Sequence, residues 1–371
     1  MAGTPFLSIV VPFHNSAETC RPLLDQLEQL DGSGEVELIF VDDGSDDATP
    51  RILREFARRS KAPVAIIEQS RAGPGAARNA GLDRATGKYI WFVDSDDVID
   101  LAAVSIAKEA GWQDLDLVVW DWDHPRIAQR LAPGLHSTND GPAPPDVLDP
   151  IVCNWFSHSF LERTRLRFPE FTFYEATPLE FFVLPLLVDH YLKVDFVAYR
   201  ANVSTPSITR GADWSRAARF DCLHTIPLGM AFVAEARLDE GARSAFEAAF
   251  IRTFLWYVVS LSPLPGRSWL GALRVMRLYR EQARALGVLR DPRPLYPGGH
   301  LSGLVMRFLW LASAAIPSQR SHFRRLRNRL WSRDIVWEPP QMPNRYRAMA
   351  GATLPRAEVD PGSNLEARAD P

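Results

Sequence analysis

The sequence predicts an α/β fold in which a mostly parallel sheet is flanked by helices. Short apolar runs that fit buried strands alternate with segments of helical periodicity, and turn residues separate them. The first three strands are expected over 6–11, 36–41 and 63–67, with helices between them that end near Leu30 and Arg59. Acidic residues follow several of these runs, which places carboxylates at the edge of the sheet where α/β proteins bind ligands.

The most informative stretch is Lys88 to Asp97, KYIWFVDSDD. Its aromatic and β-branched part has no polar alternation, as in a strand that is covered on both faces. Asp94, Asp96 and Asp97 follow at the end of this strand and repel one another. A divalent cation, or a ligand that donates hydrogen bonds, is the usual reason for such crowding. The alternative is a solvated turn in which Asp97 caps a helix over 99–110.

Length, charge and cysteine content limit the possible classes of protein. The 371 residues suffice for one large domain or two smaller ones, and the net charge of −3 argues against a nucleic-acid binder. Cys20, Cys153 and Cys222 do not form the pattern of a disulfide framework, so we expect a reducing compartment. No apolar run reaches the ~18–20 residues needed to cross a bilayer. We therefore expect a cytoplasmic protein.

A second informative stretch is 71–81, RAGPGAARNAG. Its glycines lie in a loop that leads into a short helix, which carries Arg78. Small residues allow a ligand to approach the backbone closely, and a helix N-terminus beside Arg71 favours an anion. The alternative is an ordinary Gly-Pro turn. A P-loop is excluded, because no Gly-Lys-Ser/Thr follows.

Four segments in order, SIVVPFHN, VDDGSDD, RAGPGAARNAG and GKYIWFVDSDD, resemble the nucleotide-sugar-binding half of the family 2 glycosyltransferases. These are inverting enzymes of the Rossmann-like GT-A fold, and the resemblance covers about the first third of the chain. It implies an inverting hexosyltransferase that depends on a metal ion. The expected donor is a UDP-sugar. The expected acceptor is a saccharide or a lipid-linked saccharide, in the assembly of a surface polysaccharide.

The resemblance also implies roles for individual residues. Asp96 would bind an Mn²⁺ or Mg²⁺ ion that bridges the diphosphate, and Asp97 beside it is assigned to catalysis. Oxygen ligands suit both ions, and the metal would neutralise charge on the leaving group. Contacts to the nucleotide-sugar are expected from Pro12, Asp42, Asp43, Arg71, Gly73, Arg78, Asp94, Ser95, Arg200 and Ser207. For Arg200 and Ser207 the alternative is a strand followed by a solvated turn.

The sequence departs from the family between 168 and 186. Similar enzymes carry Glu-Asp here, and the Asp takes the proton of the acceptor hydroxyl, whereas this chain has Glu175-Ala176. Glu175 is our candidate for the base, with Glu170 and Glu180 as alternatives, because a base must reach the attacking hydroxyl. The rival hypothesis is a catalytically weak, transferase-like protein that binds sugar nucleotides or acts as a scaffold at the membrane.

The chain is predicted to divide into a catalytic domain (1–211), a helical region (212–337) and a disordered tail (338–371). Residues 301–333 are apolar at first and rich in arginine afterwards. This pattern fits an interfacial helix on anionic lipid, which would place the protein peripherally on the inner face of the cell membrane. The alternative is a packed helix with a solvated basic end or a dimer surface.

Overall fold

The computed structural model describes most of residues 3–202 and parts of the C-terminal half. The described residues are 3–112, 115–123, 131–138, 141–144, 148, 150–202, 222–261 and 335–346, with single positions and short runs between 273 and 314. The predictions for Ser207 and for most of 301–333 concern residues outside these ranges, and so does the expected domain boundary at 211.

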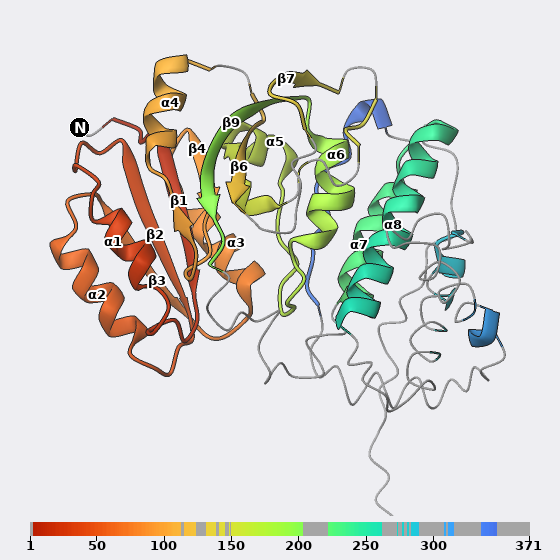
Figure 1. The fold of residues 1–371 in the computed structure, drawn as a ribbon, viewed down its shortest axis with the longest axis horizontal. Coiled ribbons are helices and arrows are strands. Elements are labelled where there is room, and N and C mark those ends of the chain that lie inside the picture. Colours follow the sequence, from red (N-terminus) through yellow and green to blue (C-terminus); the bar gives the residue numbers. More distant parts are fainter. Residues whose placement is uncertain are drawn as a thin grey trace, which may run out of the picture.

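The described strands form one mixed sheet in the order β3-β2-β1-β4-β8-β6-β9-β5, with β7 paired to β9 (Figure 1). The pairs among β3, β2, β1 and β4 are parallel, as predicted. Beyond β4 the pairing is mixed, because β8 runs antiparallel to both β4 and β6. The strands are β1 (Leu7–Phe13), β2 (Val36–Asp43), β3 (Val64–Gln69), β4 (Tyr89–Phe92), β5 (Val98–Ile99), β6 (Leu117–Asp123), β7 (Gly134–Ser137), β8 (Asn154–Ser157) and β9 (His190–Arg200).

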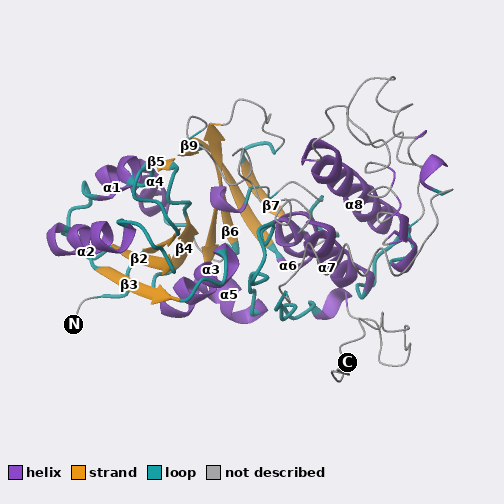
Figure 2. Ribbon diagram, turned by 90° about the horizontal axis from the view of Figure 1, so that it is seen from below, coloured by secondary structure: helices purple, strands orange, loops and turns teal. Residues whose placement is uncertain are grey.

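Helices cover both faces of the parallel part of the sheet. Figure 2 shows α1 and α2 on one face and α3 with α5 on the other, which is the doubly wound arrangement. The helices are α1 (Arg21–Leu27), α2 (Thr49–Arg59), α3 (Pro74–Arg84), α4 (Ala102–Ala110), α5 (His158–Thr164), α6 (Leu184–Leu187), α7 (Cys222–Ala234) and α8 (Glu240–Leu261), with the short turns η1 (Ile151–Cys153), η2 (Leu179–Val183) and η5 (Asn344–Tyr346).

Two local features differ from the sequence prediction. The helix expected from Ile99 begins at Ala102, because Val98 and Ile99 pair with β9 instead. Asp97 is therefore not its cap. Part of the expected disordered tail is also described, and Tyr346 is only 6% exposed. The Pro-rich composition after Glu338 conceals this packed aromatic residue.

The helical layer of α7 and α8 lies beside η2 and α6 (Figure 1). Phe182 of η2 and Phe250 of α8 place their ring centroids 6.4 Å apart. A Cβ at Gly229 of α7 would come within 2.6 Å of Phe182, so only glycine allows this approach. None of the described helices combines the length and the apolar composition that crossing a bilayer requires.

An aromatic cluster fixes β4, the strand that leads to the three aspartates. Trp155 of β8 lies 5.4 Å from Trp91 of β4 and 4.9 Å from Trp120 of β6, measured between ring centroids. All three indoles are almost completely buried. Trp91 Nε1 also donates a hydrogen bond of 2.6 Å to the carbonyl oxygen of Val152. Burial of such large side chains dominates core energetics. The strand end that carries Asp94 is therefore held rigidly.

We predict that Gly81→Ala lowers the free energy of unfolding by about 1–3 kcal/mol, the usual cost of overpacking a core. A methyl group at this position of α3 would overlap Cγ1 of Val10 on β1. Chemical denaturation measures the loss. Gly3→Ala is the control, because an added Cβ there meets nothing within 4 Å. The double variant with Val10→Ala should lose less than the sum of the two single changes. Simple additivity would contradict the overlap.

Candidate functional site

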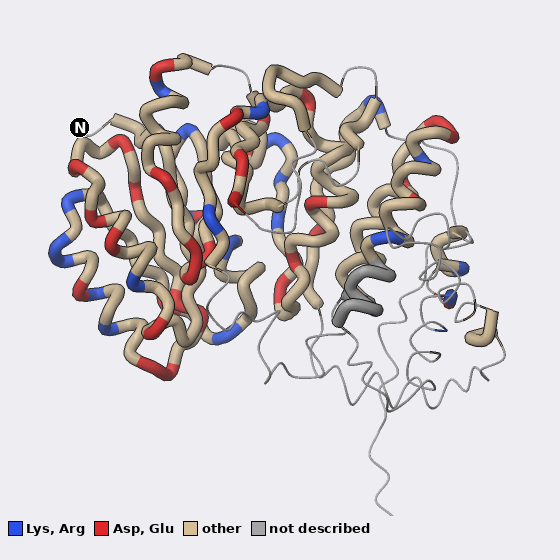
Figure 3. The backbone as a smooth tube through the Cα atoms, viewed as in Figure 1, with Lys and Arg blue, Asp and Glu red and all other residues tan. Residues whose placement is uncertain are grey.

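The carboxyl ends of β1, β2 and β4 bring together residues that lie far apart in the sequence. His14 Nδ1 lies 2.9 Å from the carbonyl oxygen of Asp43, and Ser16 Oγ lies 2.9 Å from Ser95 Oγ. In Figure 3, acidic segments recur along this edge, at the bottom of the sheet in the view. The three parallel strands thus place the predicted acidic motifs at one edge.

The two aspartates at the end of β2 differ in what surrounds them. Asp43 Oδ1 accepts hydrogen bonds from Gln69 Nε2 (2.8 Å) and Ala72 N (2.7 Å), and its Oδ2 accepts one from Gly73 N (2.8 Å). This carboxylate therefore holds the 71–73 loop. Asp42 is equally buried, yet its Oδ1 has no hydrogen-bond partner among the described residues. A buried acceptor without a donor is costly, so Asp42 is the better candidate for a ligand contact.

Arg78 of α3 joins two acidic residues at the centre of the site. Its Nη2 donates to Asp94 Oδ1 over 2.7 Å, and its Nη1 donates to Glu175 Oε1. Both Arg78 and Glu175 are buried. Burial alone would lower the pKa of Arg78, but the charges of Asp94 and Glu175 raise it. Burial raises the pKa of Glu175, and the guanidinium opposes this rise. The pair is stable only while both members keep their partners.

The segment 168–175, which we call the acceptor-side loop, lies directly on α3. Asn79 Nδ2 donates to the carbonyl oxygen of Phe168 (3.0 Å), and Phe168 N donates back to Asn79 Oδ1 (2.9 Å). A Cβ at Gly75 would overlap the carbonyl oxygen of Pro169. The absence of a side chain at Gly75 therefore makes room for the acceptor-side loop and not for a ligand. Sequence reasoning missed the contact, because the partners are far apart in the chain.

Asp97 is held by Tyr199 of β9 and by Asn202 just beyond that strand. Tyr199 Oη donates to Asp97 Oδ2 over 2.5 Å, and Asn202 N donates to Oδ1 over 2.8 Å. Burial, followed by the charge of Asp94, raises the pKa of Asp97 to about 7, against the effect of the Tyr199 hydrogen bond. Asp97 is thus occupied in fixing the end of β9. The local sequence does not reveal that Tyr199 is the partner of Asp97, because 102 residues separate the two.

The site fits a divalent cation only if a ligand completes the coordination. Among the described residues, no group of three or more His, Cys, Asp or Glu side chains is arranged to hold a metal ion. Asp94 exposes 39% of its side chain, and Asp96 is partly buried. Magnesium is commonly held by one or two carboxylates together with phosphate oxygens and water. The aspartates present suit that mode of binding.

The remaining predicted residues lie around this centre. Pro12 is partly buried in β1, and Arg71 is exposed in the loop that Asp43 holds. Arg200 pairs with Val98 at the end of β9, and its Nη1 lies 4.0 Å from Asp100 Oδ2. Both alternatives to Glu175 make other contacts. Glu170 Oε1 accepts from Asn79, and the buried Glu180 accepts from Ile151 N.

Comparisons with known proteins agree with this geometry. The family described as "Glycosyl transferase family 2" matches residues 8–125. The "Uncharacterized glycosyltransferase EpsJ" of Bacillus subtilis is 36% identical over 115 residues, which are 31% of this chain and 33% of EpsJ. The "Poly(ribitol-phosphate) beta-N-acetylglucosaminyltransferase TarS" of Staphylococcus aureus is 37% identical over 94 residues, which are 25% of this chain and 16% of TarS. The aligned part therefore spans a third or less of each relative.

The structural comparison covers more of the chain. The crystal structure of S. aureus TarS 1-349 in complex with UDP-GlcNAc matches with a TM-score of 0.56 and 20% identity, over 91% of this chain and 96% of that one. Such a likeness shows the fold. The predicted GT-A fold is thereby confirmed.

We predict that Arg78→Met lowers the free energy of unfolding by about 3–5 kcal/mol, because it leaves the buried Glu175 carboxylate without a partner. Chemical denaturation followed by tryptophan fluorescence measures the loss. Arg54→Met is the matched control, since its ion pair with Glu68 is more than half exposed and should contribute at most about 1 kcal/mol. Adding Glu175→Gln to Arg78→Met should restore part of the stability. Equal instability of the single and double variants would contradict the pairing.

Proposed function

We propose that this chain transfers a sugar from a UDP-sugar to a saccharide or lipid-linked saccharide, because residues 8–125 match the model of glycosyl transferase family 2. The observation that carries the proposal is that Asp42, Asp94 and Asp96 lie at one edge of the sheet. Beside them is the 71–73 loop, whose backbone amides donate hydrogen bonds to Asp43. The name of the relative TarS, which acts on poly(ribitol-phosphate), supports a role in the assembly of a surface polymer.

The nucleotide half of the donor is proposed to lie over the 71–73 loop and the end of β1. Asp42 Oδ1 lacks a donor among the described residues, and the N3–H of uracil would supply one. Pro12, Arg71 and Gly73 border the same space. The structure of TarS 1-349 holds UDP-GlcNAc, which supports a uridine nucleotide here.

The diphosphate and sugar are proposed to lie beside Asp94, Ser95 and Asp96. A divalent cation bound by Asp96, either Mn²⁺ or Mg²⁺, would neutralise the charge that develops on the leaving diphosphate. Arg78 fixes the orientation of Asp94 through their 2.7 Å contact. Asp97 acts as a positioning residue, since it anchors Tyr199 and Asn202 at the far side of the site. Displacement at the anomeric carbon by the acceptor hydroxyl would invert the configuration.

The reaction needs a general base that accepts the proton of the acceptor hydroxyl. Glu175 remains the candidate, but it is buried and one of its oxygens contacts Arg78. A base has to come within hydrogen-bond reach of the acceptor hydroxyl. The same geometry, together with Ala176, favours a second candidate function, a protein that binds sugar nucleotides and transfers sugar weakly.

We predict release of UDP from one UDP-sugar of a panel of UDP-, GDP- and TDP-sugars, with water as a slow acceptor. Turnover should require Mn²⁺ or Mg²⁺ and cease with a chelator. Asp96→Ala should reduce it at least about a hundredfold, since a bound metal supplies several kcal/mol of transition-state stabilisation. Asp25→Ala on the exposed face of α1 is the control. Failure of the wild type to bind any donor would overturn the proposal.

The two candidate functions predict opposite results at positions 175 and 176. If Glu175 is the base, Glu175→Gln should lower turnover by about 10²–10⁴, the usual contribution of general base catalysis. Glutamine keeps the shape and still accepts a hydrogen bond from Arg78. If the chain is a weak transferase, Glu175→Gln should change little and Ala176→Asp should raise turnover strongly. Initial rates with a saccharide acceptor distinguish the two outcomes.

A further inference from the structure

The segment 335–346, which we call the C-terminal strap, returns to the catalytic domain and runs along the chain that follows α5 (Figure 1). Gln341 N donates to the carbonyl oxygen of Thr164 over 3.0 Å. Trp337 Nε1 donates to the carbonyl oxygen of Arg167, also over 3.0 Å. Glu170 N donates to the carbonyl oxygen of Val336 over 2.9 Å, in an antiparallel bridge. The strap therefore pairs with the beginning of the acceptor-side loop.

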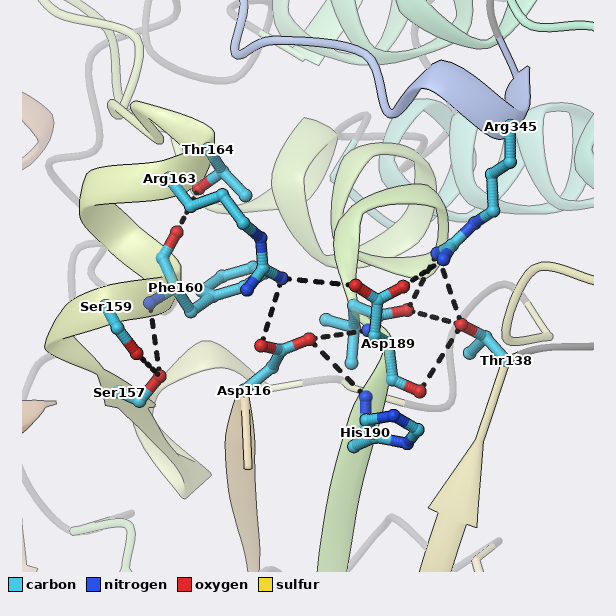
Figure 4. A network of polar contacts seen from close by, with 11 residues as sticks. Asp116, Thr138, Ser157, Ser159, Phe160, Arg163, Thr164, Asp189, His190 and Arg345 are labelled. Atoms are coloured by element: carbon cyan, nitrogen blue, oxygen red, sulfur yellow. Dashed lines mark hydrogen bonds and ion pairs between the residues drawn. The ribbon is translucent and has the colours of Figure 1, made fainter. Parts of the chain in front are cut away.

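The other end of the strap is fastened to two parts of the fold. Arg345 forms an ion pair with Asp189 at the start of β9, and its Nη2 lies 3.3 Å from both Thr138 Oγ1 and the carbonyl oxygen of Val188 (Figure 4). Tyr346 is buried, and its carbonyl oxygen accepts a hydrogen bond from Arg237 N, just beyond α7.

A hollow of about 420 Å³ lies at this junction, where β6 and β9 begin. It is at the opposite edge of the sheet from the acidic residues. Its charged side chains pair with one another: Asp189 contacts both Arg345 and Arg163, and Arg163 also contacts Asp116 over 3.0 Å (Figure 4). Opposite charges thus balance within the hollow. This arrangement fastens the strap and does not itself indicate a ligand.

The contacts made by the strap continue directly into the candidate site. Next to the bridge at Glu170, Phe171 has a positive φ of 59°, a conformation that is costly for a side chain of this size. Its N–H donates to the carbonyl oxygen of Ala72, in the loop that Asp43 holds. Glu175 ends the acceptor-side loop on Arg78. A strained residue persists only where its surroundings hold it, and the strap supplies one side of that support.

We propose that the C-terminal strap is a positioning element of the donor site. By pairing with Glu170 it keeps Phe171 against Ala72 and keeps Glu175 on Arg78, which orients Asp94. Trp337 is the positioning residue, because its indole fixes the strap to Arg167 beside that bridge. The effect on donor binding rests on the proposed function. The effect on the acceptor-side loop does not.

The test compares Trp337→Ala, Trp337→Phe and wild type by amide hydrogen exchange and by UDP titration with Mn²⁺. In Trp337→Ala, amides over 170–172 should exchange about tenfold faster, and the dissociation constant for UDP should rise about fivefold, as expected when a local hydrogen-bonded unit opens. Trp337→Phe keeps an aromatic ring but loses the indole N–H donor, so its effect should be intermediate. Amides of β1 and β2 should exchange as in the wild type.

Trp112→Ala is the matched control. Trp112 is also partly buried and packs on Trp120, away from the strap. Its loss should lower stability without changing exchange over 170–172. Unchanged exchange there in Trp337→Ala would overturn the proposal. Faster exchange with unchanged UDP affinity would also overturn it, since the strap would then be merely structural. A wild type that binds no UDP would overturn the proposed function, while the exchange comparison still decides whether the strap holds the loop.

A second pair of variants tests the far end of the strap. Arg345→Gln removes the ion pair with Asp189 and should raise exchange over 170–172 about two- to threefold, the scale of an ion pair that is one-third exposed. Arg345→Lys keeps the charge and should restore most of the protection. Lys108→Gln breaks an ion pair of similar exposure with Glu35 and should leave these amides unchanged. Equal exchange in Arg345→Gln and Arg345→Lys would contradict an electrostatic attachment.

Discussion

The site depends on the two ion pairs that the buried guanidinium of Arg78 forms with Asp94 and Glu175. A charged group removed from water is tolerated only when opposite charges and hydrogen bonds replace the solvent. Glu175 and Asp94 do so from two different parts of the chain, the acceptor-side loop and the end of β4. Helix α3, the sheet edge and that loop are therefore one electrostatic unit. A displacement of α3 would separate both carboxylates from Arg78, and a displacement of either carboxylate would leave Arg78 with one partner instead of two.

This unit separates the acidic residues of the edge into two groups. The carboxylate oxygens of the first group accept hydrogen bonds within the protein: Asp43 from backbone amides, Asp97 from a tyrosine and Glu175 from an arginine. These residues therefore shape the site. Asp42 keeps a buried oxygen without a donor in the described part of the chain, and Asp94 keeps more than a third of its side chain exposed. Hydrogen bonds from neutral donors stabilise the carboxylates of Asp43 and Asp97, and the Arg78 charge stabilises that of Glu175. Those of the second group are suited to a bound ligand.

The sequence predicted the features that depend on residues close together in the chain. The parallel strands and their acidic ends follow from apolar runs such as 89–93 and from the rule that ligands meet the carboxyl edge. The contact between Arg78 and Glu175 did not follow, because 97 residues separate them and no local pattern marks one as the partner of the other. Gly75 was interpreted as space for a ligand, whereas the carbonyl oxygen of Pro169 fills it. Tyr346 was hidden in a Pro-rich segment that composition alone marks as a tail.

Glu175, the candidate base, lies in the same loop that the C-terminal strap contacts at Glu170. Burial raises the pKa of Glu175 and the Arg78 guanidinium opposes this rise. The distance between Glu175 and the acceptor hydroxyl decides whether Glu175 can work as a base. That distance is set by the acceptor-side loop, which contains a strained residue and is bridged to the strap at Glu170. A loop held in this way keeps Glu175 on Arg78. Movement of the strap would be the simplest way to change what Glu175 can reach.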